Sequence, residues 1–117
     1  MLFLHIIDDY FLQGCLAQLK QQLWWQKNEP DLLYRNDYKM ALFMHSFSWS
    51  FSIMIPLLFL LEKDITWTIL LAYPINTAIH YFIDDLKANK RKINLIVDQL
   101  VHIVQIVLTW AIYVWMI

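Results

Sequence analysis

This chain has few charged residues and almost no glycine. Only 16% of its 117 residues are charged, the net charge is −1, and there is one glycine and one cysteine. The lone Cys15 excludes an intramolecular disulfide, and the low, balanced charge excludes a disordered chain and a nucleic-acid binder. Instead, 60% of the residues are hydrophobic and 16% aromatic. A single domain over residues 1–117 is too small to bury so much apolar surface in an aqueous core, so we expect lipid to surround much of it.

Three stretches are long and apolar enough to be membrane-spanning helices. They cover residues 40–61, 65–86 and 93–117. The first two contain Pro56 and Pro74, which membrane helices tolerate. Polar segments separate the stretches: a loop over residues 26–39, a short turn over 62–64, and the basic run 87–92.

The N-terminal segment, residues 1–25, is apolar but interrupted by Asp8 and Asp9. We expect a helix that lies in the membrane interface or inserts partway, with Trp24 and Trp25 at headgroup level and Gly14 as a plausible break point. The predicted fold class is therefore an all-α integral membrane protein with three transmembrane helices and an N-terminal interfacial or half-inserted helix. The alternative is a four-span helical bundle.

Lysine and arginine are concentrated in two of the polar segments. The 26–39 loop and the 86–93 loop carry most of them, whereas the 62–64 turn has only Lys63. The positive-inside rule places both basic loops in the cytoplasm and the C-terminus on the far side. This pattern predicts a multi-pass protein of the cell's inner (cytoplasmic) membrane.

All four histidines lie within or beside the apolar segments, and three of them are paired with aspartate. His5 and Asp9 are four residues apart, as are His80 and Asp84, so each pair shares a helix face. Asp98 and His102 repeat this spacing in reverse order. Because the second and third spans run antiparallel, the reversed order brings like residues to like depth. With a rise of about 1.5 Å per residue, one layer below the cytoplasmic surface holds five residues: His45, His80, Asp84, Asp98 and His102.

Ionisable side chains inside a membrane are costly and are functional candidates by default. Imidazoles and carboxylates suit a divalent metal ion such as Zn²⁺, Mn²⁺ or Fe²⁺, and there are enough of them here for two ions. The predicted metal ligands are His5, Asp9, His45, His80, Asp84, Asp98 and His102. The predicted catalytic groups are Asp9, Asp84, Asp98 and Gln99. We expect Gln13 and Lys87 to contact and orient these side chains without binding the metal ion themselves. Asp8 and Asp85 are offset from the pairs and stay outside the ligand set.

These motifs resemble a family known as domain of unknown function 3307, which comprises small bacterial and phage-borne membrane proteins. The resemblance covers nearly the whole chain: His5-x-x-x-Asp9-Tyr10-x-Leu12-Gln13, a downstream lysine for which Lys20 is the candidate, His45, His80-x-x-x-Asp84-x-x-Lys87 and Asp98-Gln99-x-x-His102. It implies a membrane location and supports these site residues without assigning a reaction. More distantly, the His45-Ser46 step followed by H-x-x-x-D is similar to membrane-bound metal-dependent hydrolases.

The predicted function is metal-assisted hydrolysis of a phosphoester or amide in a lipid or lipid-linked substrate, at the depth of the cytoplasmic headgroups. The predicted partners are membrane lipid and that substrate, and the sequence leaves a homo-oligomer open. Two alternatives remain. The His/Asp cluster could serve helix packing in a non-enzymatic, phage-type accessory protein, or it could relay protons or metal ions in transport.

Overall fold

A computed structural model describes residues 1–60 and 67–116, and every regular element within these ranges is helical. The expectation of an all-α fold is confirmed for this part of the chain. The elements are α1 (Leu2–Ile7), η1 (Asp8–Leu12), α2 (Leu16–Leu19), α3 (Gln22–Asn28), η2 (Leu32–Tyr34), α4 (Asp37–Leu60), α5 (Trp67–Ala88) and α6 (Leu95–Met116). Of these, η1 is one π-helical turn and η2 is one 3-10 turn.

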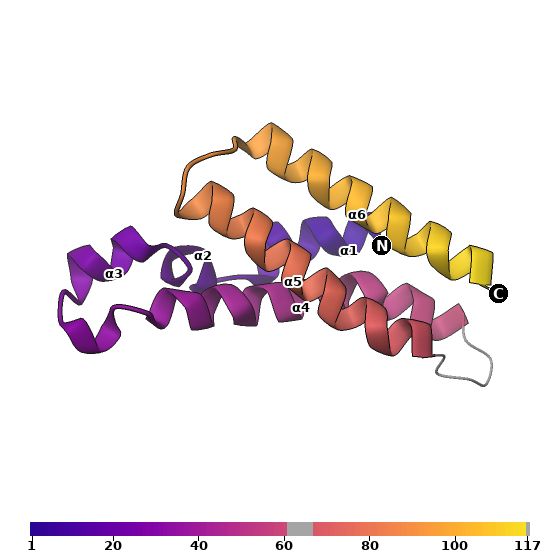
Figure 1. Ribbon diagram of the computed structural model, residues 1–117, viewed down its shortest axis with the longest axis horizontal. Helices are drawn as coiled ribbons and strands as arrows, with labels where there is room; N and C mark the ends of the chain where they lie inside the picture. The colour runs from indigo at the N-terminus through magenta and orange to yellow at the C-terminus, as the bar shows by residue number, and fades with distance from the viewer. Residues whose placement is uncertain (61–66, 117) are drawn as a thin grey trace.

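The three long helices α4, α5 and α6 form the body of the molecule (Figure 1). α5 packs along both α4 and α6, and the start of α4, the end of α5 and the start of α6 lie at the same end. The two basic loops therefore share one end of the bundle. α4 begins at Asp37, inside the expected 26–39 loop. The expected 62–64 turn and the span ends at residues 61, 65 and 117 lie outside the described residues.

Two helical stretches of the described chain are long and apolar enough to cross a membrane, Leu32–Phe59 and Leu95–Trp115. The third expected span, carried by α5, does not meet the same criterion over its described residues. Polar side chains such as Asn76, Thr77 and His80 lower its hydropathy, and all three are buried against neighbouring helices. These polar side chains of α5 thus face the protein interior.

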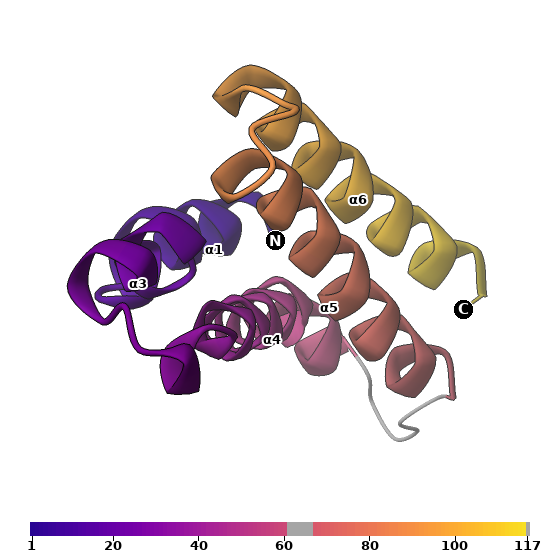
Figure 2. The same ribbon diagram turned by 60° about the vertical axis from the view of Figure 1, so that its left-hand side comes forward.

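The N-terminal segment differs most from the expectation of a single helix over residues 1–25. Gly14 has a φ of +49°, a left-handed conformation that glycine adopts without a steric penalty, and the helix breaks there as the sequence suggested. The short α2 follows, and α3 continues to Asn28. Figure 2 shows α1 docked beside the long helices, and Met1 packs against their apolar core.

That core lies between the C-terminal half of α4 and its two partner helices. Its buried members are Trp49, Ile53, Met54, Leu57, Ile69, Ile106 and Tyr113. Many large apolar side chains point outward instead, including Phe51 on α4 and Leu100 on α6. Some apolar side chains of the helices thus form a narrow core, and many others lie on the outer surface.

Truncation of a core residue should destabilise the fold, whereas truncation of an outward neighbour should not. Ile53 is fully buried and Phe51 is 53% exposed, and both lie on α4. We expect Ile53→Ala to cost about 2–5 kcal/mol of stability because it leaves a cavity. Phe51→Ala, as the matched control, should leave the unfolding midpoint in detergent nearly unchanged. Equal losses for the two variants would contradict the assigned orientation of α4.

Candidate metal centre

Beyond the apolar core, toward the basic loops, the interior becomes polar. The buried ionisable side chains come from the N-terminal segment and from all three long helices: His5, Asp8, Asp9, Lys20, His45, His80, Asp84, Asp98 and His102. All are at most 9% exposed. The structure therefore brings all seven sequence-predicted metal ligands into one buried layer, which we call the His/Asp layer.

Two groups of potential metal ligands overlap at His80. The first contains Asp9, His45 and His80, and the second contains His80, Asp84 and His102; within each group the ligand atoms lie within 4.8 Å of one another. The Nε2 atoms of His45 and His80 are 3.2 Å apart. His80 therefore occupies the centre of the layer and is shared by both groups.

Aspartate oxygens lie between these imidazoles. Asp9 Oδ1 is 3.3 Å from His45 Nε2 and 3.8 Å from His80 Nε2. Asp84 Oδ1 is 3.8 Å from His80 Nε2 and 3.5 Å from His102 Nε2. Each Oδ1 atom thus faces two imidazoles, while Oδ2 of Asp9 lies 3.5 Å from His5 Nδ1 and Oδ2 of Asp84 lies 3.3 Å from His45 Nε2. This arrangement is open to a shared proton or to a shared metal ion.

Two lysines form short ion pairs with the layer. Lys20 Nζ donates to Asp84 Oδ2 and Lys87 Nζ donates to Asp98 Oδ2, each at 2.6 Å. In both aspartates the other oxygen, Oδ1, faces His102, at 3.5 Å from Asp84 and 3.4 Å from Asp98. Partial burial disfavours the charged form of Lys87, but the Asp98 carboxylate outweighs it and raises the lysine's pKa. Lys87 therefore stays an ammonium ion at the rim of the layer, paired with Asp98.

His5 lies in the layer but is in neither ligand group. The indole Nε1 of Trp49 donates to His5 Nδ1 at 2.7 Å, and an indole N–H can only donate, so Nδ1 must be unprotonated. His5 Nε2 then carries the proton and donates to Gln99 Oε1 at 3.1 Å. Burial lowers the pKa of His5, in keeping with a neutral ring. Both ring nitrogens are thereby occupied, and His5 holds Gln99 in place.

Gln99 joins the two sides of the layer. Its amide nitrogen donates to Asp98 Oδ2 at 3.0 Å and to Asp9 Oδ2 at 3.4 Å. Burial alone would raise the pKa of Asp9, but a hydrogen bond from His45 and the nearby His80 lower it to about 2. Gln13, in contrast, donates its amide to the backbone carbonyl of Asp9. Gln13 therefore supports the ligand helix rather than a ligand side chain.

Asp8 is the residue of the layer that the sequence analysis left outside the ligand set, and Lys20 is the one that only the family resemblance suggested. The π-helical turn that begins at Asp8 turns both adjacent aspartates inward, with exposures of 1% and 8% for Asp8 and Asp9. The hydroxyls of Ser48 and Ser52 donate to Asp8 Oδ1 at 2.7 and 3.1 Å. The four-residue spacing of these serines on α4 is the available sequence signal for this contact.

The charges of the layer do not cancel when the imidazoles are neutral. The layer holds four buried carboxyl groups (Asp8, Asp9, Asp84 and Asp98) and two ammonium groups, Lys20 paired with Asp84 and Lys87 paired with Asp98. Burying uncompensated charge is costly, so an excess of two negative charges must be neutralised. Protons on two of the imidazole or carboxyl groups achieve this, and so does one divalent metal ion bound among them.

Comparison of the chain with protein-family models, with curated proteins and with solved structures finds no match. The resemblance to domain of unknown function 3307 therefore stays a prediction from the motifs. The geometry of the His/Asp layer is therefore the basis on which a function can be inferred.

Two buried serines on α4 provide a matched test of the Asp8 contact. Ser52→Ala removes a hydrogen bond to a buried carboxylate and should cost about 1–3 kcal/mol of stability. Ser50 is fully buried, but its hydroxyl has no hydrogen-bond partner, so Ser50→Ala should retain or raise stability. Thermal unfolding in detergent measures both, and a larger loss for Ser50→Ala would show that the Ser52–Asp8 hydrogen bond does not stabilise the fold.

Proposed function

We propose that this chain is a membrane-embedded, metal-dependent hydrolase that acts on a lipid or lipid-linked substrate from the cytoplasmic side. The observation that carries the proposal is the pair of His/Asp ligand groups that meet at His80. Imidazole nitrogens and carboxylate oxygens from four separate segments converge there. This is the donor set that Zn²⁺, Mn²⁺ or Fe²⁺ takes in proteins.

The balance of charge favours one resident ion. A single divalent cation neutralises the excess of two negative charges in the layer, whereas two such ions would reverse its sign. His102 Nε2 and Asp98 Oδ1 are buried and make no hydrogen bond; they face each other at 3.4 Å, a separation that both could keep as ligands of one ion. An ion held by His80, Asp84 and His102, with Asp98 beside it, would satisfy both the charges and these two atoms.

Such an ion supplies Lewis-acid polarisation and lowers the pKa of water. The residues around it divide the remaining tasks. Asp9 and Asp84 accept protons within the layer, and Gln99 orients groups between Asp9 and Asp98. The side chain of Lys87 is 32% exposed at the rim and, with the basic run 87–92, provides positive charge for an anionic headgroup.

The membrane placement is part of the proposal. We propose three spans, formed by α4, α5 and α6, with the N-terminal segment half-inserted beside them from the cytoplasmic side of the inner membrane. The outward apolar faces of α4 and α6 and the shared end of the two basic loops support this arrangement (Figure 1).

One observation favours a second candidate, a purely structural cluster. The pairs Lys20–Asp84 and Lys87–Asp98 are short, and such pairs can join helices without any metal ion. In that case two protonated imidazoles, rather than an ion, supply the missing positive charge.

Metal content and coupled substitutions separate these candidates. We expect close to one divalent ion per chain after purification without chelators. We expect His80→Ala and His102→Ala each to lower the unfolding midpoint, with a double variant that falls short of their sum because one loss already removes the ion. Added Zn²⁺ or Mn²⁺ should stabilise the parent and the control Thr77→Val, but neither histidine variant. Additive losses and a parent insensitive to metal would show a structural cluster.

Cysteine labelling tests the membrane orientation. On a Cys15→Ser background, Arg35→Cys and Arg91→Cys should resist a membrane-impermeant maleimide in intact spheroplasts and react after lysis, because both basic loops are expected inside. Trp115→Cys, at the opposite end of α6, is the control expected to react from outside. External labelling of Arg35→Cys or Arg91→Cys would overturn the proposed topology.

A further inference from the structure

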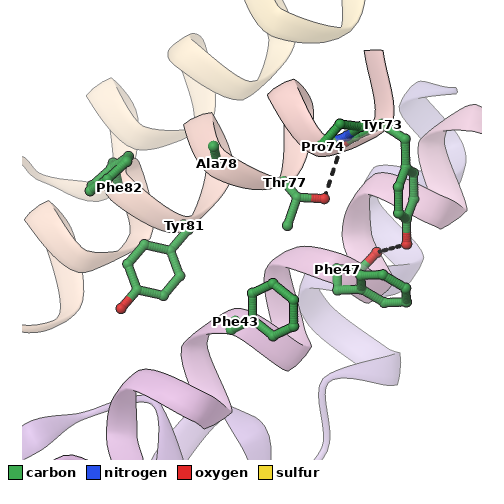
Figure 3. Close-up of a pocket in the computed structure, with 8 residues that line it drawn as sticks. All are labelled: Phe43, Phe47, Tyr73, Pro74, Thr77, Ala78, Tyr81 and Phe82. Atoms are coloured by element: carbon green, nitrogen blue, oxygen red, sulfur yellow. Dashed lines mark hydrogen bonds between the residues drawn. The ribbon is translucent and has the colours of Figure 1, made fainter. Parts of the chain in front are cut away.

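The His/Asp layer is closed to solvent in this structure. Its residues are at most 9% exposed, whereas the proposed hydrolysis requires that a metal ion and a substrate reach them. Two hollows between the long helices offer no route. A cavity of about 480 Å³ between α4 and α5 is lined by Phe43, Tyr73, Ala78 and neighbouring residues (Figure 3), and a groove of about 590 Å³ lies between α5 and α6. No residue of the layer lines either one, so access requires that part of the layer's cover moves.

One part of this cover is the segment over residues 15–28, which contains α2 and α3 and which we call the flap. Lys20 of the flap donates to Asp84 Oδ2 at 2.6 Å, and the same oxygen lies 3.3 Å from His45 Nε2. Lys20 is itself only 9% exposed. Withdrawal of Lys20 together with the flap would therefore uncover the Asp84 carboxylate, which contacts His45.

The flap has little apolar packing. No side chain of α2 or α3 is buried, and the buried members of the apolar core all lie on α4, α5 and α6. Its hydrogen bonds to α5 are made with two residues. Besides the Lys20–Asp84 pair, the Asn89 side chain accepts from the Gln22 backbone N–H at 2.7 Å and donates to the Lys20 backbone carbonyl at 3.2 Å. A segment with few buried apolar contacts opens at a lower free energy than the core helices.

Opening of the flap also returns the charges of Lys20 and Asp84 to water. Hydration then replaces much of the attraction that the buried ion pair provides, because taking both charges out of water had a free-energy cost of its own. The two hydrogen bonds of Asn89 have no such compensation in the closed state, so they are the contacts that keep the flap in place.

The chain on the N-terminal side of the flap is fixed more firmly. Asp8 accepts hydrogen bonds from Ser48 and Ser52 of α4. Between Asp8 and the flap lies Gly14, whose φ of +49° interrupts the helix and whose backbone is free to adopt other conformations. Rotation about Gly14 can therefore withdraw the flap while Asp8 stays in the layer.

We propose that the flap is a gate that opens about Gly14 to admit the metal ion and the substrate to the His/Asp layer, and that Asn89 holds it closed. The inference rests on the proposed function, because a hydrolase needs access to its buried site. Asn89 belongs to the basic run 87–92, at the end of the bundle where the two basic loops lie (Figure 1). The gate therefore opens toward a lipid's polar end, and the adjacent cations favour an anionic headgroup.

Chemical modification of the buried histidines tests the gate. The probe is diethyl pyrocarbonate, which acylates the imidazoles that it can reach, and the full-length protein is held in lipid nanodiscs with EDTA. We expect Asn89→Ala to raise the modification rate of His45 about tenfold, because it removes hydrogen bonds that hold the flap closed. The matched control is Asn94→Ala, which removes a hydrogen bond from the Val97 N–H at the start of α6 and should leave the rate near that of the parent.

A reversible crosslink tests the same movement in the opposite direction. On a Cys15→Ser background, Gln22→Cys together with Asn89→Cys places two thiols where a hydrogen bond now joins the flap to α5. The oxidised protein should react more slowly than the parent, and the reduced protein faster. If the disulfide does not form, the comparison of Asn89→Ala with Asn94→Ala decides the question.

Hydrogen exchange shows where the chain opens. In Asn89→Ala we expect faster exchange over residues 15–28 and unchanged exchange in α4, α5 and α6. Equal modification rates for the two asparagine variants, equal rates for the oxidised and reduced forms, or faster exchange throughout the long helices would overturn the inference. Because EDTA is present, a failure of the gate is distinguishable from a failure to bind metal: a protein that takes up an ion but shows equal rates loses the gate and keeps the metal site.

Discussion

The burial of four carboxylates among apolar helices is the constraint on which the rest of this structure depends. Such charges are tolerated only when each is paired or hydrogen-bonded, and each of the four carboxylates has at least one partner from another helix or segment. Lys20 pairs with Asp84 and Lys87 pairs with Asp98. Two serines donate hydrogen bonds to Asp8, and Gln99 links Asp9 to Asp98. The N-terminal segment, which has little apolar packing of its own, is held to the bundle largely through these contacts.

Much of the fold could be predicted because its signals are local. Long apolar runs located the three long helices to within a few residues, and the single glycine located the break after η1. The N-terminal arrangement could not be predicted in the same way. A π-helical turn has no distinctive sequence pattern, and α4 begins at Asp37 inside a polar segment, where hydropathy gives no signal for a helix.

The candidate site, too, could be predicted only as far as its sequence signals are local. The four-residue spacing of histidine and aspartate predicted which side chains share a helix face, and the mirrored order on α5 and α6 predicted their common depth. The roles within the layer depend on contacts between distant residues. The neutral form of His5 follows from Trp49, which is 44 residues away, and the burial of Lys20 follows from Asp84, which is 64 residues away. The spacing of residues within one helix gives no signal for contacts between residues so far apart in the sequence.

The same long contacts bear on how the chain assembles during synthesis. His5 and Lys20 are translated early, yet Gln99 and Asp84, their partners, are translated 94 and 64 residues later. Until then these two contacts cannot form, although Ser48 and Ser52, which donate to Asp8, are already available. Contacts of such high sequence separation form slowly, and they make the last helix the step that completes the interior. Docking of α6 therefore closes the structure for the residues that left the ribosome first.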